Sequence, residues 1–308
     1  MGVGSRISPA LHSPLPIMLT VYLNGDFLPL DQARVPVMDR GFLFGDGVYE
    51  VIPVYDRQPF RLADHLRRLG QSLAGIRLDN PHGDAEWTHI IQAMIQGAPW
   101  DDMGLYLQVT RGSGPTRDHP FPAQVRPTIF LMPLALKAPP AGLIAQGVSA
   151  ITAQDNRWLR CDLKTTSLLA NVLLRQLSVD ADCAETLLLR DGWLTEGSAS
   201  SVFIVKDGVI LTPPETHRML PGITYEVVLE LARSHAMAHE VRPVSEAELR
   251  SADEVWITSS TKEVLAVTRL DGRPVGNGVE AGKPGPIFRR MLTVYQDYKR
   301  TVMRGQKP

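Results

Sequence analysis

Residues 158–167 read Trp158-Leu-Arg-Cys-Asp-Leu-Lys164-Thr-Thr-Ser167, and this stretch decides the fold of the chain. Lysine is scarce in the sequence, with seven lysines against twenty-five arginines. Lys164 lies between an apolar approach and the start of a predicted helix, which Thr165, Thr166 or Ser167 could cap. A partly desolvated amine in such a place can attack a carbonyl. By spacing alone a solvated lysine at a helix start is the commoner case, so other segments must decide.

Three later segments supply polar groups that could share a site with Lys164. The stretch Leu194-Thr-Glu196-Gly-Ser198 sets a carboxylate beside a small-residue turn, although alone it is typical of a plain Glu-Gly turn. The stretch Leu220-Pro-Gly-Ile223-Thr224 opens a helix with free amide donors, which favours an anion, although an ordinary capped helix is the commoner case. The stretch Ile257-Thr-Ser259-Ser260-Thr261 ends a strand in hydroxyls that could donate to phosphate or merely cap a turn.

The remaining pattern predicts a two-domain α+β protein. Strands are expected at 19–23, 47–55, 105–111 and 128–132, and helices at 62–76 and 87–97. The stretch Lys137-Ala-Pro-Pro-Ala-Gly142 is the best domain boundary, because adjacent prolines stop regular structure. Beyond it, strands are expected at 148–152, 184–190, 201–205, 209–212 and 254–258, and helices at 168–181, 224–235, 245–250 and 285–303. The expected division is a disordered extension over 1–17, an N-terminal α/β domain over 18–136, a linker over 137–143 and a C-terminal domain over 144–308.

Composition excludes several classes of function. The net charge of −1 and the absence of a basic run argue against nucleic-acid and membrane-surface partners. No apolar stretch approaches the ~20 residues that a membrane-spanning helix needs. The two cysteines, Cys161 and Cys183, cannot form a disulfide framework, and no His/Cys cluster has the spacing of a metal site. We therefore expect free thiols and a cytoplasmic protein whose partners are small molecules.

In their order along the chain, these segments resemble the fold-type IV pyridoxal-phosphate enzymes, the class IV aminotransferases, and most closely the D-amino-acid aminotransferases. The resemblance runs from Met18 to about Arg304, and Gly41-Phe-Leu-Phe-Gly-Asp-Gly-Val-Tyr-Glu-Val51 is similar to the family's first-domain signature. It implies a smaller N-terminal α/β sandwich, a larger C-terminal pseudo-barrel domain and a homodimer.

The resemblance also implies a role for individual residues. Lys164 would hold pyridoxal 5′-phosphate as a Schiff base and move the proton at the substrate Cα. Glu196 would pair with the pyridine nitrogen, because an anionic carboxylate keeps that nitrogen protonated. The other expected cofactor contacts are Arg68, Ile223, Thr224, Ser259 and Ser260 around the phosphate, Arg157 near the cofactor and Leu220 on the ring face.

A loop carries the expected substrate contacts. The segment Thr110-Arg-Gly-Ser-Gly-Pro-Thr-Arg117-Asp-His119 holds a guanidinium, which offers two parallel donors to a carboxylate. With Tyr49, Arg117 and His119 resemble the carboxylate trap of D-amino-acid aminotransferases, in which the loop crosses a dimer interface. Taken alone, Arg117 and His119 would be solvated loop residues. The loop is one residue longer than expected of relatives, and residues 165–167 also depart from the relatives' pattern.

Three hypotheses about function stay open. The first is a transaminase that moves the amino group of a D-amino acid, such as D-alanine, to a 2-oxo acid, such as 2-oxoglutarate, by a ping-pong mechanism. The second is another activity of the same fold: branched-chain L-amino-acid transamination, R-selective amine transamination or aminodeoxychorismate lyase chemistry. The third is a relative that binds pyridoxal phosphate without turnover. The presence of Lys164, Glu196 and the phosphate residues favours an enzyme.

Overall fold

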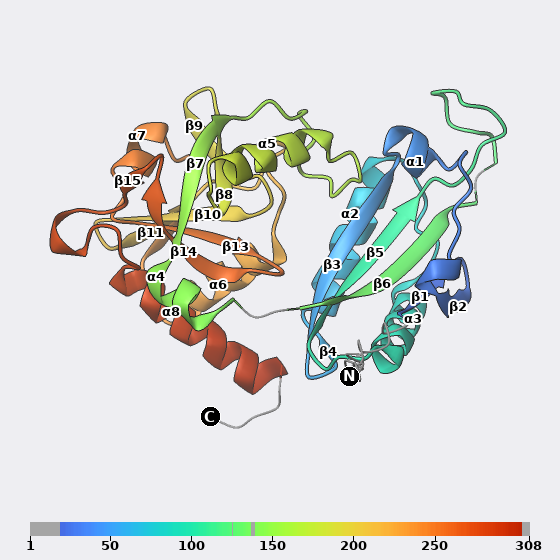
Figure 1. The fold of residues 1–308 in the computed structure, drawn as a ribbon, viewed down its shortest axis with the longest axis horizontal. Coiled ribbons are helices and arrows are strands. Elements are labelled where there is room, and N and C mark those ends of the chain that lie inside the picture. The colour runs from blue at the N-terminus through green and yellow to red at the C-terminus, as the bar shows by residue number, and fades with distance from the viewer. Residues whose placement is uncertain (1–18, 125, 137–138, 304–308) are drawn as a thin grey trace, which may run out of the picture.

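Two β-sheets organise the chain, one in each half of the sequence (Figure 1). The computed structural model describes residues 19–124, 126–136 and 139–303. The extension expected over residues 1–17 lies outside the described residues, as do Lys137 and Ala138 of the expected linker. The chain passes once from the first sheet to the second, between β6 (Thr128–Ala135) and α4 (Ala141–Gln146).

The first sheet has six strands in the order β2-β1-β6-β5-β3-β4. A tight hairpin joins the first two strands of the sheet, and its turn residues Asn24 and Gly25 have φ values of 53° and 112°, as the Asn-Gly pair of such a turn favours. Two helices pack on the sheet and enclose a core that includes Trp87 and Leu105. The elements of this half are β1 (Thr20–Leu23), β2 (Asp26–Pro29), η1 (Leu30–Gln32), α1 (Arg40–Phe44), β3 (Gly47–Tyr55), β4 (Gln58–Pro59), α2 (Leu62–Gly75), α3 (Asp84–Gly97) and β5 (Met103–Thr110), followed by β6.

The second sheet has nine strands and curls upon itself, with the order β12-β11-β10-β13-β14-β7-β8-β9 and β15 paired to β14. One core lies inside the curl and includes Leu187 and Ile257. The elements are β7 (Val148–Gln154), α5 (Leu169–Asp180), β8 (Glu185–Arg190), β9 (Trp193–Gly197), β10 (Ser201–Lys206), β11 (Val209–Thr212), α6 (Ile223–Ser234), β12 (His239–Val241), α7 (Glu246–Arg250), β13 (Glu254–Ser259), β14 (Glu263–Leu270), β15 (Arg273–Pro274), η2 (Gly278–Glu280), α8 (Pro286–Tyr298) and the π-helix η3 (Lys299–Met303).

A second core of this half joins the two parts of the molecule. It fills the space between the outer face of the curled sheet and helices α6 and α8, around Trp256, Phe288 and Tyr295. Tyr55 and Phe60, which come from the first half, are 2% and 1% exposed and belong to the same cluster. The hairpin of β3 and β4 is therefore buried against α8, in the same core as residues of the second half.

The α+β fold class is confirmed, although several elements were not predicted, namely helices α1 and α4 and strands β2, β4, β9, β12, β14 and β15. Strand β14 is buried along nearly its whole length, so it lacks the alternation that marks a half-exposed strand. The side-chain cap expected at the start of α5 is wrong, because Leu168 occupies the N-cap without such a bond. Thr166 and Ser167 instead donate their hydroxyls to the Gly45 carbonyl at 3.0 Å and so attach this segment to the first half of the chain.

Within the described residues, none of the helices is long and apolar enough to cross a membrane. No group of three or more His, Cys, Asp and Glu side chains is placed to hold a metal ion within the described ranges.

Candidate active site

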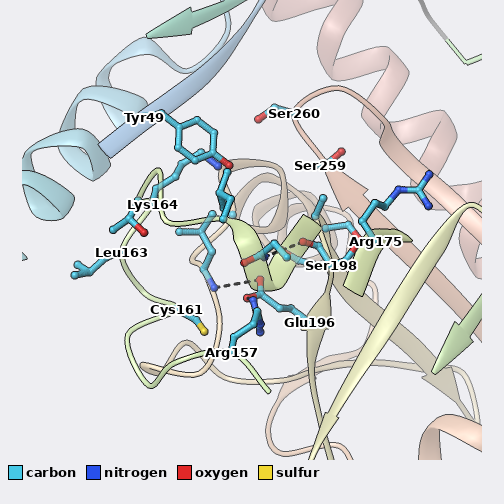
Figure 2. A pocket seen from close by; sticks show the side chains of 18 of the residues that line it. Tyr49, Arg157, Cys161, Leu163, Lys164, Arg175, Glu196, Ser198, Ser259 and Ser260 are labelled. Carbon is cyan, nitrogen blue, oxygen red and sulfur yellow. Dashed lines mark hydrogen bonds and ion pairs between the residues drawn. The ribbon is translucent and has the colours of Figure 1, made fainter. Parts of the chain in front are cut away.

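A cavity of about 430 Å³ opens between the two halves of the molecule (Figure 2). The first half contributes Tyr49 and Arg68, and the second half contributes the remaining lining. The predicted site residues that line it are Tyr49, Arg68, Arg157, Lys164, Glu196, Leu220, Ile223, Thr224, Ser259 and Ser260. Arg117 and His119 do not line it. Segments scattered over more than two hundred residues of sequence thus meet at one cavity.

Lys164 is held by the first half of the chain although it belongs to the second. Its backbone N–H donates to the Ser72 hydroxyl at 3.1 Å, and its carbonyl accepts the Tyr49 N–H at 2.9 Å. The side-chain nitrogen Nζ lies 4.2 Å from the centre of the Tyr49 ring, a cation–π contact. With its peptide fixed on both sides, Lys164 can place its amine in the cavity with little loss of backbone freedom.

Glu196 is the buried acid of the cavity. It is 5% exposed, and its Oε1 accepts from the Arg157 Nη1 at 2.5 Å while its Oε2 accepts from the Leu220 N–H at 3.2 Å. Burial raises the pKa of Glu196 to about 7, with Arg157 and the Leu220 N–H acting against the rise. A carboxyl with this pKa can share a proton with a basic ring nitrogen near neutral pH.

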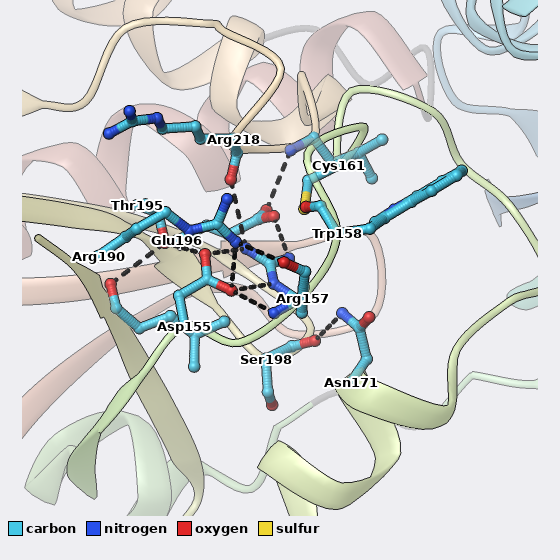
Figure 3. A network of polar contacts seen from close by, with 12 residues as sticks. Asp155, Arg157, Trp158, Cys161, Asn171, Arg190, Thr195, Glu196, Ser198 and Arg218 are labelled. Carbon is cyan, nitrogen blue, oxygen red and sulfur yellow. Dashed lines mark hydrogen bonds and ion pairs between the residues drawn. The ribbon is translucent and has the colours of Figure 1, made fainter.

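Arg157 is kept in place by a second acid behind it (Figure 3). Asp155 accepts from the Arg157 Nε at 2.9 Å and from its Nη2 at 3.0 Å. Burial would raise the pKa of Asp155, but Arg157 and Arg190 outweigh it and hold the pKa below its usual value. Thr195 completes the network by donating its hydroxyl to Asp155 at 3.0 Å. The guanidinium that faces Glu196 is therefore fixed, and Asp155 is a site residue that no sequence motif had singled out.

Backbone N–H donors line the cavity where α6 begins. Gly222 is the N-cap and supplies no side-chain bond, so the first N–H groups of the helix stay available to a ligand. Arg68 donates from Nη1 to the Pro221 carbonyl at 2.7 Å and lies beside this helix start. Its Nε and Nη2 are bound to Glu50 at 2.8 and 2.7 Å, which leaves part of the guanidinium to face the cavity.

Arg68 belongs to a buried triad with Glu50 and His65. Burial would raise the pKa of Glu50, but Arg68 and His65 hold it well below its usual value. His65 is fully buried, and burial lowers its pKa, so the ring is neutral and donates from Nδ1 to Glu50 at 2.8 Å. The triad therefore carries one negative and one positive charge. Glu50 lies in the stretch Gly41–Val51 and His65 in the helix expected at 62–76, but nothing in their spacing singled them out.

Hydroxyl groups line the cavity next to the helix start. Ser259 and Ser260 lie at the end of β13, as expected, and Ser259 Oγ accepts the Lys262 N–H at 3.1 Å. Thr258 also lines the cavity; it is 2% exposed, and its Oγ1 has no partner among the described residues. A buried hydroxyl without a partner indicates a ligand atom in the complete site. The hydroxyl run was the signal for Thr258, but the sequence could not say which of its members face inwards.

Glu185 braces the turn that follows Glu196. Its carboxylate is fully buried and accepts from the Ser200 hydroxyl at 2.8 Å and from the Ser198 hydroxyl. Lys262 reaches it at 3.2 Å from the turn after β13. Burial would raise the pKa of Glu185, but Lys262 and the serine hydroxyls hold it below its usual value. One carboxylate thus ties together two of the segments that line the cavity.

Arg117 and His119 lie elsewhere, on the loop between β5 and β6 that extends beyond α1 (Figure 1). Both are exposed, and both contact Phe44, with 5.0 Å from the Arg117 guanidinium to the ring centre and 5.4 Å between the His119 and Phe44 rings. Arg40 is 5% exposed and donates to the carbonyls of Asp118 at 2.6 Å and His119 at 3.0 Å. The loop is therefore fixed at its base, and Arg117 and His119 are not among the residues that line the chain's own cavity.

Comparison with known proteins agrees with this geometry. The family model described as amino-transferase class IV matches residues 47–270. D-alanine aminotransferases of Bacillus licheniformis and Staphylococcus epidermidis are 40% and 36% identical over 279 and 282 residues, which is 91% of this chain and 96% and 98% of theirs. Among solved structures, a branched-chain amino acid aminotransferase from T.th., in complex with pyridoxamine 5′-phosphate, has a TM-score of 0.84 at 26% identity, covering 94% of this chain and 96% of that one. The Escherichia coli branched-chain enzyme has a TM-score of 0.83 at 25% identity, covering 91% and 94%.

The chain therefore belongs to the class IV aminotransferase family. It is an aminotransferase that works with pyridoxal 5′-phosphate, and the resemblance found in the sequence is confirmed. The residues present fit this cofactor. Glu196 is a buried acid that could bind the ring nitrogen. The start of α6, which has no side-chain cap, and the Thr258 hydroxyl, which has no partner among the described residues, could bind a phosphate.

Proposed function

We propose that this chain transfers the amino group of a D-amino acid, such as D-alanine, to a 2-oxo acid, such as 2-oxoglutarate. The observation that carries the proposal is that Lys164 and Glu196 line the same cavity, in a chain 34–40% identical to D-alanine aminotransferases over most of its length. The fold itself is shared with branched-chain amino acid aminotransferases. The residues around the substrate, and not the fold, must therefore decide how the substrate is oriented in the cavity.

Lys164 is the residue to which the cofactor attaches. Pyridoxal 5′-phosphate supplies an aldehyde for the amine and a ring that takes up the electron pair released at the substrate Cα. The Lys164 Nζ would remove the proton from the substrate Cα and deliver it to C4′, the former aldehyde carbon of the cofactor, first as a base and then as an acid. Glu196 holds a proton on the ring nitrogen, and Arg157 fixes the carboxylate that does so. Leu220, which lines the cavity, would pack against one face of the ring.

The phosphate belongs at the start of α6. The N–H groups of Ile223 and Thr224 and the hydroxyls of Ser259 and Ser260 would donate to its oxygens, and Arg68 supplies the positive charge. Support for this assignment comes from the bare N-cap and from the unpaired Thr258 hydroxyl in the same cavity.

The substrate carboxylate is held by Arg117 and His119 of a second copy, together with Tyr49 of the copy that binds the cofactor. Tyr49 lines the cavity, whereas Arg117 and His119 are exposed and do not line it, and a homodimer would bring the three together. Helix α5 borders the cavity and exposes an apolar stripe that such a dimer would cover, namely Leu169, Val172, Leu173 and Leu177. On the evidence of its two free thiols, Cys161 and Cys183, we place the enzyme in the cytoplasm.

The proposal is tested by a substrate panel. We expect purified protein to convert D-alanine and 2-oxoglutarate to pyruvate and glutamate, and to act on L-alanine, L-leucine and R-1-phenylethylamine at least about a hundredfold more slowly. The Lys164→Ala variant is the blank. Faster turnover of L-leucine would assign a branched-chain activity, and faster turnover of the amine would assign an amine transaminase. No turnover of any of them would leave a non-catalytic relative.

A further inference from the structure

Helix α8 and the π-helix after it lie behind the hydroxyl end of the cavity, and their contacts converge on one residue. Glu263 is the first residue of β14, and it pairs in the sheet with Ser259, the last residue of β13. Only the turn of Ser260 to Lys262 separates the two. Glu263 thus forms one end of the turn that presents the hydroxyls of Ser259 and Ser260 to the cavity.

The side chain of Glu263 is 7% exposed and bound on all sides. It accepts from the Tyr55 hydroxyl at 3.1 Å, from the Gln296 amide at 2.6 Å and from the Lys299 ammonium. Lys299 is 8% exposed, and its Nζ also lies 4.2 Å from the centre of the Tyr55 ring. Three parts of the chain, at Tyr55, Glu263 and residues 296–299, therefore meet in one buried cluster.

The backbone of Glu263 adopts a conformation that a glutamate rarely takes. Its φ is 57°, in the left-handed region, where a glycine would meet less steric resistance. A three-residue hairpin turn commonly ends in a residue of this conformation. A glycine here could not contact Lys299. The contacts of the Glu263 side chain therefore offset the backbone strain and fix the end of the turn.

Helix α8 also contacts the start of α6, the other group of residues expected to bind phosphate. Tyr295 is 1% exposed, and the Thr224 side chain at the start of α6 lies near its hydroxyl. On the cavity side of the turn, Ser259 Oγ is oriented by the Lys262 N–H. Both sets of groups expected to bind phosphate are therefore supported from behind by residues 295–299.

We propose that the Glu263–Lys299 ion pair is a positioning device for the phosphate of the cofactor. Lys299 and Glu263 touch no ligand; they hold the turn after β13 so that the hydroxyls of Ser259 and Ser260 keep their direction. The C-terminal segment is in this sense part of the cofactor site. The inference rests on the proposed place of the phosphate at the start of α6.

A comparison of two ligands tests this inference. Lys299→Met keeps the length of the side chain and removes its charge. We expect the variant to bind pyridoxal 5′-phosphate about tenfold to a hundredfold more weakly than the parent, because hydrogen bonds to a charged phosphate lose their geometry. Affinity for pyridoxal, which has no phosphate, should change by less than about twofold. Release of pyridoxal 5′-phosphate from the diluted holoenzyme and titration of the stripped full-length chain with each ligand give the two constants.

Three further variants complete the design. Glu263→Gln should reproduce the selective loss and serves if Lys299→Met does not fold. Lys299→Arg restores the charge and should restore affinity for the phosphate ligand. Lys283→Met removes a matched lysine from the exposed pair with Glu280 and should leave both affinities unchanged.

Two results would overturn the inference: unchanged affinity of Lys299→Met for pyridoxal 5′-phosphate, or an equal loss of affinity for both ligands. The equal loss would mean general loosening of the fold. Failure of the parent chain to bind pyridoxal 5′-phosphate at all would instead contradict the proposed function, so the two failures are distinguishable.

Discussion

The hydroxyl of Ser72 accepts the backbone N–H of Lys164 at 3.1 Å across the junction between the two halves of the chain. Ser72 is 1% exposed and lies on α2, so the reactive lysine of the second half is positioned by a helix of the first. Because the cavity lies at the same junction, any change in how the halves fit together moves Lys164 relative to Glu196.

Replacing Ser72 by alanine should weaken both folding and catalysis. The change leaves a buried N–H without its partner, which costs about 1–3 kcal/mol of the free energy of unfolding. We expect this loss in urea unfolding and a fall in kcat of about tenfold, because the lysine loses one of its two backbone anchors. Ser234→Ala, an exposed serine of α6, is the matched control. Unchanged kcat in Ser72→Ala would mean that the Tyr49 N–H alone positions Lys164.

Glu196 should give the protein without cofactor a pH-dependent stability. The carboxyl titrates near 4.5 in the unfolded chain, and burial raises its pKa to about 7 in the folded chain. Between these values the folded state binds more protons, so the free energy of unfolding falls as the pH rises, by about 3 kcal/mol in total.

The Glu196→Gln variant removes the titrating group and should flatten this slope between about pH 4.5 and about pH 7. Urea unfolding of the stripped protein across this range measures it, with the exposed Glu280→Gln as control. A slope that persists in Glu196→Gln would assign the proton uptake to another group. With cofactor bound, the same variant should lose about a hundredfold or more in kcat, since a neutral amide holds the ring proton poorly.

Arg117 should matter for the carboxylate of the substrate and for nothing else. We expect Arg117→Ala to lower kcat/KM for D-alanine by about a hundredfold or more, while any residual activity on amines without a carboxylate stays within about twofold. Arg34→Ala removes another exposed arginine and is the control. An equal loss on both kinds of substrate would contradict a carboxylate contact.

The partner's use of that loop can be tested by mixing two inactive chains. In a hybrid dimer of Arg117→Ala and Lys164→Ala, one site has both the lysine of the first chain and the loop of the second. Co-expression in equal amounts should restore about a quarter of the parent activity. If the loop serves its own chain, every site lacks one residue, and the mixture stays inactive.

The apolar stripe of α5 should control assembly. Leu173 is 60% exposed and lies in the middle of the stripe. A charge buried in an apolar interface without a partner is strongly unfavourable, so Leu173→Glu should yield monomers with little activity. Sedimentation of the variant measures the change. Val279→Glu alters an 88% exposed valine outside α5 and should leave the mass unchanged. A dimeric Leu173→Glu variant would place the interface on another surface.

The sequence predicted the cavity best where a residue type and a motif coincide. Lys164, Glu196 and the start of α6 were predicted because each lies in a segment whose local pattern has a chemical use. Thr258 was missed because a run of hydroxyls does not reveal which members face inwards. The proposed use of the loop with Arg117 and His119 depends on a second chain, which no local pattern describes.

The supporting contacts could not be predicted, because tertiary packing creates them. Glu263 and Lys299 are 36 residues apart, and only the packing of the C-terminal helices against the curled sheet brings them together. Ser72 and Lys164 are 92 residues apart and belong to different halves of the chain. Strand β14 was missed for a related reason: burial of both its faces removes the alternation by which a strand is recognised.

Reduction of the purified protein with borohydride tests the central claim most directly. If Lys164 carries the cofactor, the yellow protein loses its visible band, and peptide mapping finds the mass of the reduced pyridoxyl phosphate on the peptide that contains Lys164 and on no other. A label on another lysine, such as Lys262 in the turn after β13, or protein that is colourless when loaded with pyridoxal 5′-phosphate, would contradict the account.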